Sequence, residues 1–366
     1  MPKEKGMIVL MGSGELASTM VEVHKGLLAR LGDSPRAVFV DTPSGFQLNT
    51  DEISLKAVEY FSRRVNHPIT IASFKSRETI GDSEKKATYE TLETADYILI
   101  GPGSPSYATR QWLNTSIPDM FIKRIEAGGC LVTASAAALT LGPFTLPVYE
   151  IYKVGQDIHW IDGINVLNHF GLNLVVIPHW NNADGGNHDT RFCFMGKPRM
   201  DHLMALLPED VTVLGIDEHT ACILDFEKQT AEIKGIGGIT LKEHHQETFF
   251  KNGSIFPLDH LQKGGISKPI PYPTLPSELI SMPVLSEKGT FKDREAPAPL
   301  TISTNGGDSH LPMDSLAPLV DSLLELRTGY RIAGKFQEAD AIRKCLEKAN
   351  IRIEDRENRS SWYKPD

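Results

Sequence analysis

The sequence predicts an α/β domain built on a doubly wound, mainly parallel sheet, followed by a small helical appendage at the C-terminal end. In the N-terminal part, short apolar runs rich in β-branched residues alternate with amphipathic stretches, the pattern of a parallel sheet covered by helices on both faces. Near Leu258 the composition changes, and the chain becomes rich in Pro, Gly and Ser. At 366 residues the chain is long for a single hydrophobic core, so two structural units are expected.

Strand candidates and helix candidates succeed one another along the first part of the chain. The expected strands are 7–11, 37–41, 69–73, 97–100 and 130–133. The expected helices between them are 18–31, 51–64, 83–93 and 118–127. Because a helix separates consecutive strands, these strands are expected to run parallel. Later runs have hairpin-like spacing and are expected to extend or edge the same sheet, namely 174–177, 211–217, 221–226 and 231–234.

Three segments are expected: a globular domain over residues 1–258, a linker over 259–314 and a tail over 315–366. The linker contains PIPYPTLPSE and APAPLTISTNGGDS, which hold too little apolar surface to offset the entropy lost on ordering. In the tail, 315–328 and 335–349 carry apolar residues at helical spacing and predict a helical hairpin.

Composition excludes several classes of partner. The net charge of −9 disfavours nonspecific binding to nucleic acid or to an anionic membrane. The four cysteines are far apart and form no CxxC pair, so neither a disulfide framework nor a zinc site is expected. The apolar run in MPKEKGMIVLM is too short for a signal sequence or a membrane span. A cytoplasmic protein with reduced thiols and no membrane partner is therefore expected.

The stretch GGCLVTASAAALTLG holds two candidate nucleophiles, Cys130 and Ser135. In a parallel sheet, chemistry collects at the carboxyl ends of the strands, and Cys130 opens its strand at the opposite end. Ser135 follows the strand and precedes AAAL, which gives the strand, tight turn and helix of a nucleophile elbow. The start of that helix would present the Ala136 N–H to a developing oxyanion. Ser135 would equally serve as an ordinary N-cap, so its chemistry depends on a nearby base.

A serine nucleophile needs a base, and the base needs an orienting group. His179, in GLNLVVIPHW, comes just after an apolar run and is therefore placed at a strand end. Glu150, in LPVYEIYKVG, lies between Ser135 and His179 and gives the order serine, acid, histidine. Asp157 and Asp162 compete with Glu150 for the role of the acid.

A glycine-rich loop precedes the elbow. In ADYILIGPGSPSY, a strand runs into Gly101, and Ser104 and Pro105 have the residue types of an N-cap and a first helical position. Such a loop can bring a second backbone N–H, that of Gly103, to the oxyanion. The alternative is that it forms only a tight turn before a helix.

Residues 5 to about 245 resemble the serine peptidase family that contains alpha-aspartyl dipeptidase and cyanophycinase. The resemblance rests on GPGSPSY, on TASAAA where the family tends to show G-x-S-A-G-A, on IPHW followed by NNA and DTR, and on VLGIDEHTACIL. It implies the class I glutamine amidotransferase-like fold. Thr133 and Ala137 depart from the family, which usually has glycine at these elbow positions.

Carried over by position, the resemblance implies Ser135 as nucleophile, His179 as base and Glu150 as acid, fifteen residues beyond the serine (150 − 135 = 15). The family cleaves peptide bonds next to aspartate, including β-aspartyl-arginine links. We therefore expect a serine hydrolase with a small peptide or isopeptide substrate and no cofactor. Glutaminases of this fold use cysteine at the elbow, so glutamine hydrolysis is disfavoured. The missing elbow glycines leave open the alternative, a catalytically inactive binding or scaffold protein.

The tail segment FQEADAIRKCLEKANIRIEDRENRSSW resembles the C-terminal end of cysteinyl-tRNA synthetases. The matching residues are Ala339, Asp340, Ile342, Arg343, Leu346, Ile351, Glu354, Asp355 and Trp362. The HIGH and KMSKS signatures of the synthetases are absent from the sequence, so aminoacylation is not expected. Residues 312–366 hold ten Lys/Arg and ten Asp/Glu, and this balance gives little attraction to RNA. The tail is interpreted as a docking or oligomerisation appendage, with RNA contact as the weaker alternative.

Further patterns carry other interpretations. GSGELA, residues 12–17, matches GxGxxA after the first strand, and Asp41 ends the second, as in a dinucleotide site. His179 and the loop that follows it hold four potential metal ligands, namely His179, Asp184, His188 and Asp189. Their spacing fits no specific metal site, so no metal is expected. Arg191 is a candidate clamp for a substrate carboxylate, or else a surface salt-bridge partner.

Overall fold

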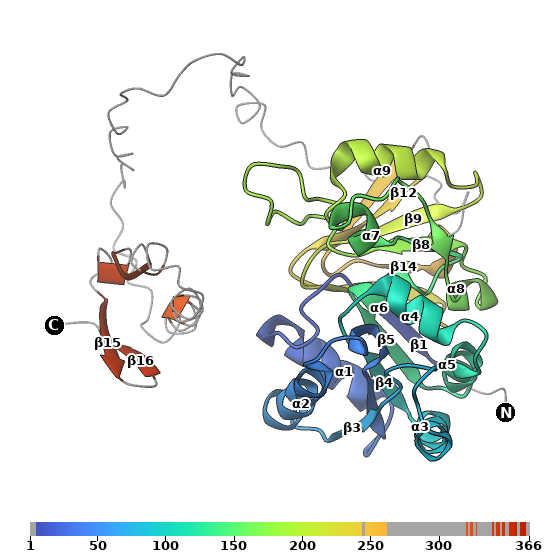
Figure 1. The fold of residues 1–366 in the computed structure, drawn as a ribbon, viewed down its shortest axis with the longest axis horizontal. Helices are drawn as coiled ribbons and strands as arrows, with labels where there is room; N and C mark the ends of the chain where they lie inside the picture. Colours follow the sequence, from blue (N-terminus) through green and yellow to red (C-terminus); the bar gives the residue numbers. More distant parts are fainter. Residues whose placement is uncertain are drawn as a thin grey trace, which may run out of the picture. The chain divides into compact units, whose positions relative to one another are not determined.

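The computed structural model describes residues 5–243, 246–261, 320, 323–324, 327, 339, 342–344, 346–347, 351–356 and 359–363. The chain divides into two compact units, Met1–Met282 and Pro283–Asp366, each described by itself below (Figure 1). The predicted linker over 259–314 lies outside the described residues, except for residues 259–261.

The first unit contains an eight-stranded sheet with the order β14-β11-β10-β1-β5-β4-β2-β3. Five neighbouring strands of this sheet run parallel, in the order β1, β5, β4, β2 and β3. They coincide with the strands that the strand–helix alternation predicts. Beyond β1, the sheet continues antiparallel through β10, β11 and β14. The strand bounds are β1 Met7–Met11, β2 Ala37–Val40, β3 Ile69–Ala72, β4 Tyr97–Ile100, β5 Cys130–Ala134, β10 Thr220–Asp225, β11 Thr230–Gly235 and β14 Ile255–Pro257. The predicted large, mainly parallel sheet is confirmed.

Helices bury both faces of this sheet. Along β1, Ile8 and Leu10 point into one hydrophobic core, whereas Val9 and Met11 point into the other. Figure 1 shows α1 and α2 on one side of the sheet and α3, α4 and α5 on the other. The helix bounds are α1 Val21–Arg30, α2 Thr50–Tyr60, α3 Asp82–Thr94, α4 Pro105–Trp112, α5 Ile117–Glu126 and α8 Val166–His169. Shorter 3-10 or π turns lie at Ser18–Met20, Thr42–Ser44, Phe61–Val65 and Leu258–Leu261.

A second sheet of four strands has the order β13-β12-β9-β8. Here β8 (Leu174–Ile177) and β9 (Thr212–Ile216) are parallel, and β12 (Gly238–Lys242) and β13 (Glu247–Lys251) continue antiparallel. The prediction that runs 174–177 and 211–217 extend the main sheet is wrong. The physical reason is that β10 takes the open side of β1, so β8 and β9 pair with each other instead.

The second sheet is buried on both faces as well. Val176 and Leu214 join one core of the main sheet, whereas Val175 and Val213 face a third core. That core also receives side chains from α7 (Val148–Tyr152) and α9 (Gly196–Ala205). The described part of the first unit also holds a short helix, α6 (Ala136–Leu139), and a small hairpin of β6 (Phe144–Thr145) and β7 (Ile161–Asp162).

The second unit combines helical residues with a hairpin. The described helical residues fall within the predicted helices, and Val320, Leu324, Leu346 and Ile351 form a small core. β15 (Arg352–Arg356) and β16 (Arg359–Tyr363) pair antiparallel. The sequence predicted a purely helical appendage and missed this hairpin, whose strands are too short and polar to stand out by periodicity. Asp340 lies outside the described residues.

Candidate active site

Ser135 occupies the tight turn between β5 and α6. Its backbone has φ 51° and ψ −116°, a region that non-glycine residues rarely adopt, and its N–H donates to Met11 O at 3.1 Å. This is the backbone geometry of a nucleophile elbow, which holds a serine side chain above the end of a sheet. Thr133 fits without glycine because it lies within β5 and its hydroxyl donates to Val9 O at 3.4 Å. Ala137 is buried in the main core.

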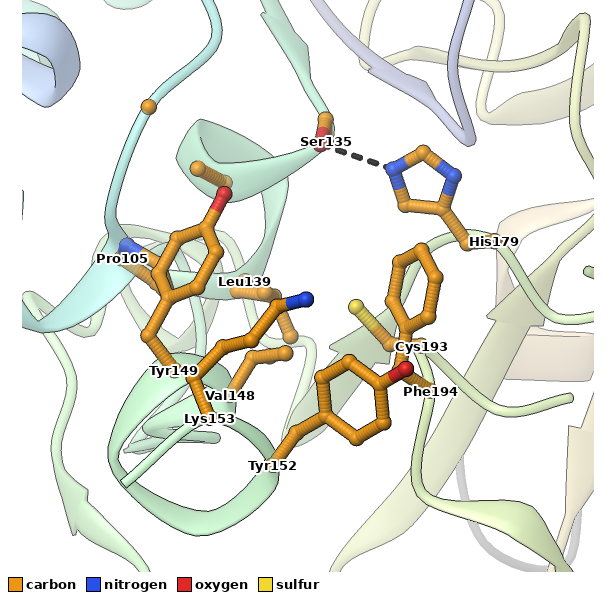
Figure 2. Close-up of a pocket in the computed structure, with 12 residues that line it drawn as sticks. Pro105, Ser135, Leu139, Val148, Tyr149, Tyr152, Lys153, His179, Cys193 and Phe194 are labelled. Atoms are coloured by element: carbon orange, nitrogen blue, oxygen red, sulfur yellow. Dashed lines mark hydrogen bonds between the residues drawn. The ribbon is translucent and has the colours of Figure 1, made fainter. Parts of the chain in front are cut away.

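His179 follows β8 and reaches the serine. Its Nε2 lies 2.8 Å from Ser135 Oγ, a hydrogen bond through which the imidazole can accept the serine proton (Figure 2). The backbone of His179 also has positive φ, 50°, and its N–H donates to Gly12 O at 3.3 Å. The loop after β8 is thereby tied to the loop after β1, the parallel neighbour of β5.

Glu218, a residue not singled out from the sequence, faces the other nitrogen of this imidazole. Its Oε1 lies 2.9 Å from His179 Nδ1 and accepts a hydrogen bond from Asn182 Nδ2 at 3.1 Å. Partial burial acts to raise the pKa of Glu218, but the hydrogen bonds from His179 and Asn182 outweigh it and hold the pKa below its ordinary value. The carboxylate is therefore charged at neutral pH and orients the ring so that Nε2 faces Ser135.

Glu150, the acid predicted from the sequence, does not contact His179. It lies on α7, where one carboxylate oxygen accepts a hydrogen bond from Ser106 Oγ. Its other oxygen, Oε2, is buried and has no hydrogen-bond partner in the described part of the chain. The competing candidates Asp157 and Asp162 are not partners of the imidazole either, since Ser135 and Glu218 occupy its two nitrogens.

The sheet topology explains why Glu218 and not Glu150 contacts His179, and which feature of the sequence indicates it. His179 follows β8, and Glu218 follows β9 in the segment GIDE. Because β8 and β9 are parallel neighbours, their carboxyl ends meet at the same edge of the second sheet. A carboxylate two residues after one strand is thereby placed beside a histidine two residues after the other, and the order of residues along the chain is irrelevant.

The glycine loop lies against the elbow as predicted. Ser104 caps α4, with its Oγ accepting from Tyr107 N at 3.1 Å, and Pro105 is the first helical residue. Gly103 and Ala136 line the same cavity as Ser135 and His179. Ala136 opens α6, so its N–H has no acceptor within the helix. Across the described residues, no hydrogen bond uses the Gly103 amide, which leaves both amides available to an oxyanion.

We expect Gly103→Ala to lower the free energy of unfolding by about 2–4 kcal/mol, measured by chemical denaturation. Gly103 has φ 151°, and a Cβ there would lie 1.9 Å from Pro43 O. The matched control is Gly81→Ala, where φ is −70° and a Cβ would meet no atom within 4 Å. Equal stability of the two variants would show that the loop relaxes around a side chain at position 103.

A cavity of about 270 Å³ opens beside the serine and the histidine (Figure 2). Its walls are mostly apolar and aromatic, and they come from the elbow, the glycine loop, α7 and the segment before α9. The lining residues are Gly103, Pro105, Ser135, Ala136, Leu139, Val148, Tyr149, Tyr152, Lys153, His179, Cys193 and Phe194. This volume accommodates one substrate side chain next to Ser135.

Arg191, the predicted carboxylate clamp, is already paired. Its Nε and one terminal nitrogen each lie 2.8 Å from an oxygen of Asp189, a bidentate salt bridge, and its guanidinium stacks over Phe192. It does not line the cavity. The surface salt bridge, the second of the two interpretations of Arg191, matches this geometry.

The GSGELA loop is filled by protein atoms rather than open to a dinucleotide. A Cβ at Gly12 would lie 2.0 Å from Asp217 O, so this glycine allows the loop to pack against the turn after β9. Glu15 in the same loop is only 8% exposed. Asp41, the expected ribose ligand, is 1% exposed and accepts hydrogen bonds from Ser73 Oγ and Phe74 N. Both halves of the dinucleotide pattern therefore have structural roles.

Glu15→Gln should raise Tm at pH 7 by roughly 2–4 °C. Burial raises the pKa of Glu15 in the folded protein, so the folded state holds its proton more tightly than the unfolded state does. Stability is then lost as pH rises above the ordinary glutamate value of about 4.3, and the amide avoids this loss. The two proteins should converge below that pH. Glu22→Gln, at an exposed site, is the control, and a lower Tm for Glu15→Gln at pH 7 would contradict the assignment.

The remaining candidate groups have structural surroundings. Burial raises the pKa of Cys193 and of Cys222 to about 12 and raises that of Cys130 as well, so these thiols stay protonated at neutral pH. Among the residues that the structure describes, no group of three or more His, Cys, Asp or Glu side chains is placed to hold a metal ion. No described helix combines the length and the apolar character needed to cross a membrane.

Similarity to solved structures is found over most of the chain. The crystal structure of a peptidase from an acI-B1 Actinobacterium matches with a TM-score of 0.57 and 20% identity, over 70% of this chain and 98% of that one. A candidate peptidase E of Listeria monocytogenes EGD-e matches with a TM-score of 0.42 and 12% identity, over 68% of this chain and 98% of that one. The first of these likenesses shows that the chain has the α/β fold of a peptidase.

Sequence comparison gives a shorter match. No protein-family model matches the chain. A stretch of 48 residues is 46% identical to the cysteine–tRNA ligase of Thermoplasma acidophilum, which is 13% of this chain and 11% of the ligase. The chain thus spans about a tenth of that relative's length. The match is with the same class of synthetase that the tail resembles.

Proposed function

We propose that the first unit is a serine hydrolase that cleaves a peptide or isopeptide bond. One observation carries the proposal: Ser135 Oγ, both nitrogens of His179 and the Glu218 carboxylate form a continuous hydrogen-bonded relay, with contacts of 2.8 and 2.9 Å. Such a relay activates a hydroxyl that is otherwise a weak nucleophile. The strained elbow at Ser135 and the adjacent cavity support the same conclusion, because strain of this kind concentrates at functional sites.

In the proposed reaction, Ser135 Oγ attacks the amide carbonyl while His179 Nε2 takes the hydroxyl proton. Glu218 stabilises the imidazolium that results, and His179 then gives the proton to the leaving amine. The backbone N–H groups of Gly103 and Ala136 hold the developing oxyanion. Water activated by the same histidine hydrolyses the acyl-enzyme and restores the serine.

The proposed substrate is a small peptide or isopeptide cleaved next to aspartate. The motifs shared with the alpha-aspartyl dipeptidase and cyanophycinase family support this specificity, as does the fold shared with a peptidase. Glu218 takes the place of Glu150 in the proposed triad, which otherwise keeps the predicted nucleophile and base.

For the second unit we propose a docking or self-association role. Its resemblance to a synthetase C-terminus supports interaction rather than catalysis, since the match covers only 11% of the ligase. The ten Lys/Arg and ten Asp/Glu in residues 312–366 favour a protein partner over RNA. A tRNA pull-down with the full chain at low salt should recover no more tRNA than a protein control.

Hydrolysis of a substrate panel tests the proposed function. The full chain is incubated with aspartyl dipeptides, with matched asparaginyl dipeptides and with β-aspartyl-arginine, and products are identified by mass spectrometry. Cleavage of the aspartyl or β-aspartyl compounds is expected. A folded protein that cleaves no member of the panel and reacts with no serine-directed fluorophosphonate would overturn the proposal and leave the binding or scaffold role.

A further inference from the structure

A lysine with a solvent-exposed side chain lines the candidate active site. Lys153 directly follows α7 and lines the cavity together with Ser135 and His179. Figure 2 shows its side chain extending from the α7 side so that the ammonium group points into the space enclosed by the labelled side chains.

This ammonium group has no counter-ion within the described residues. Its one recorded interaction is with the ring of Tyr152, whose centroid lies 4.8 Å from Nζ. The carboxylates of the surrounding segments form hydrogen bonds with other residues: Glu150 with Ser106, Glu218 with His179, and Asp189 with Arg191. Lys153 is exposed at the edge of the cavity, and a cation there with no carboxylate of the described residues beside it is free to meet an anionic group of a ligand that enters.

We propose that Lys153 is the specificity-determining residue of this site and pairs with a carboxylate of the substrate. The inference rests on the proposed hydrolase function and names its substrate class: peptides whose acyl portion carries a side-chain carboxylate. The acyl portion is the part that stays bonded to Ser135 Oγ, so its side chain must occupy the cavity that opens at the serine. Lys153 takes the role that the sequence suggested for Arg191, whose guanidinium is held by Asp189 outside this cavity.

Matched substrates measure this pairing. For an aspartyl dipeptide and its asparaginyl counterpart, which differ in charge and hardly in shape, the ratio of kcat/KM should fall by roughly 10- to 100-fold in Lys153→Met. Lys153→Arg, which keeps the charge, should retain most of the preference, and Arg191→Met should leave it unchanged. Covalent fluorophosphonate labelling of Ser135 in Lys153→Met, at whatever rate, shows that the variant is folded and its nucleophile intact.

Two kinetic outcomes would overturn the inference. One is an unchanged aspartyl preference in Lys153→Met, and the other is loss of that preference in Arg191→Met. A preference that follows a carboxylate on the leaving group, seen by comparing free and amidated C-termini, would also contradict the assignment to the acyl portion.

A binding experiment separates this inference from the proposed function. In Ser135→Ala, which cannot form an acyl-enzyme, succinate should bind measurably by calorimetry and succinamide should not. Adding Lys153→Met should abolish succinate binding. If the wild-type chain hydrolyses nothing and this pattern is still found, the cavity is a carboxylate site and only the hydrolase proposal fails. If succinate binds equally with and without Lys153, the inference itself fails.

Discussion

Ser135→Ala should abolish covalent labelling by a fluorophosphonate and reduce kcat on aspartyl peptides by a factor on the order of 10⁶. The reason is geometric: Ser135 Oγ is the atom that His179 Nε2 contacts at 2.8 Å, and alanine removes the nucleophile while keeping the elbow. Removing the hydroxyl also removes the means of forming an acyl-enzyme, so only positioning and oxyanion contacts remain. Peptide mapping of the labelled wild-type protein should place the modification on this residue alone.

The matched control for this variant is Ser83→Ala, an exposed serine on α3. It should keep full labelling and activity. Loss of the hydroxyl at position 135 should not destabilise the fold, because the strained backbone there is held by the Ser135 N–H bond to Met11 O. A Ser135→Ala protein that remains labelled and active would assign the nucleophile to another residue.

Glu218→Gln should reduce kcat by about 10³- to 10⁴-fold with little change in KM. The amide keeps the size of the side chain but removes the charge that stabilises the His179 imidazolium, and its NH₂ group can favour the tautomer with the proton on the wrong nitrogen. Steady-state kinetics on the same aspartyl peptide measures both parameters.

Glu150→Gln distinguishes the acid in the relay from the acid predicted by position. Glu150 accepts a hydrogen bond from Ser106, and the two nitrogens of the imidazole are occupied by Ser135 and Glu218, so the amide variant of Glu150 should stay within a few-fold of wild-type kcat. The substitution should instead change the free energy of unfolding, because Oε2 of Glu150 is buried and has no hydrogen-bond partner among the described residues. Equal losses of kcat in the two variants would mean that both carboxylates serve the chemistry.

Local chemistry made the parallel core of the fold predictable. The strands around β5 read as short apolar runs because both of their faces are buried, and the helices between them set their direction. The position of Ser135 in a tight turn was predictable as well, because this small polar residue stands between a buried strand and the helix-forming segment AAAL. Ser104 and Pro105 gave a helix start whose residue preferences are strong.

Features that depend on pairing between distant segments were not predictable. The sequences of β8 and β9 do not indicate that these strands form a second sheet, because an apolar run does not specify the strand with which it pairs. Which carboxylate contacts His179 depends on that pairing, so neither the order along the chain nor the position expected from the resemblance, which both indicated Glu150, could identify Glu218 in the segment GIDE. Likewise, Arg191 and Lys153 are indistinguishable as cations until Asp189 is seen to neutralise the first.

The proposed nucleophile follows a strand of the main sheet and its proposed base follows a strand of the second sheet, so the proposed activity should depend on how the two sheets dock. Ser135 follows β5, His179 and Glu218 follow β8 and β9, and one of the main-chain hydrogen bonds between the two sheets in the described part of the chain runs from the His179 N–H to Gly12 O. A shear of about 1 Å between the layers would separate the reacting atoms enough to cost on the order of 100-fold in rate. Turnover should therefore decline on gentle heating before circular dichroism records any loss of secondary structure.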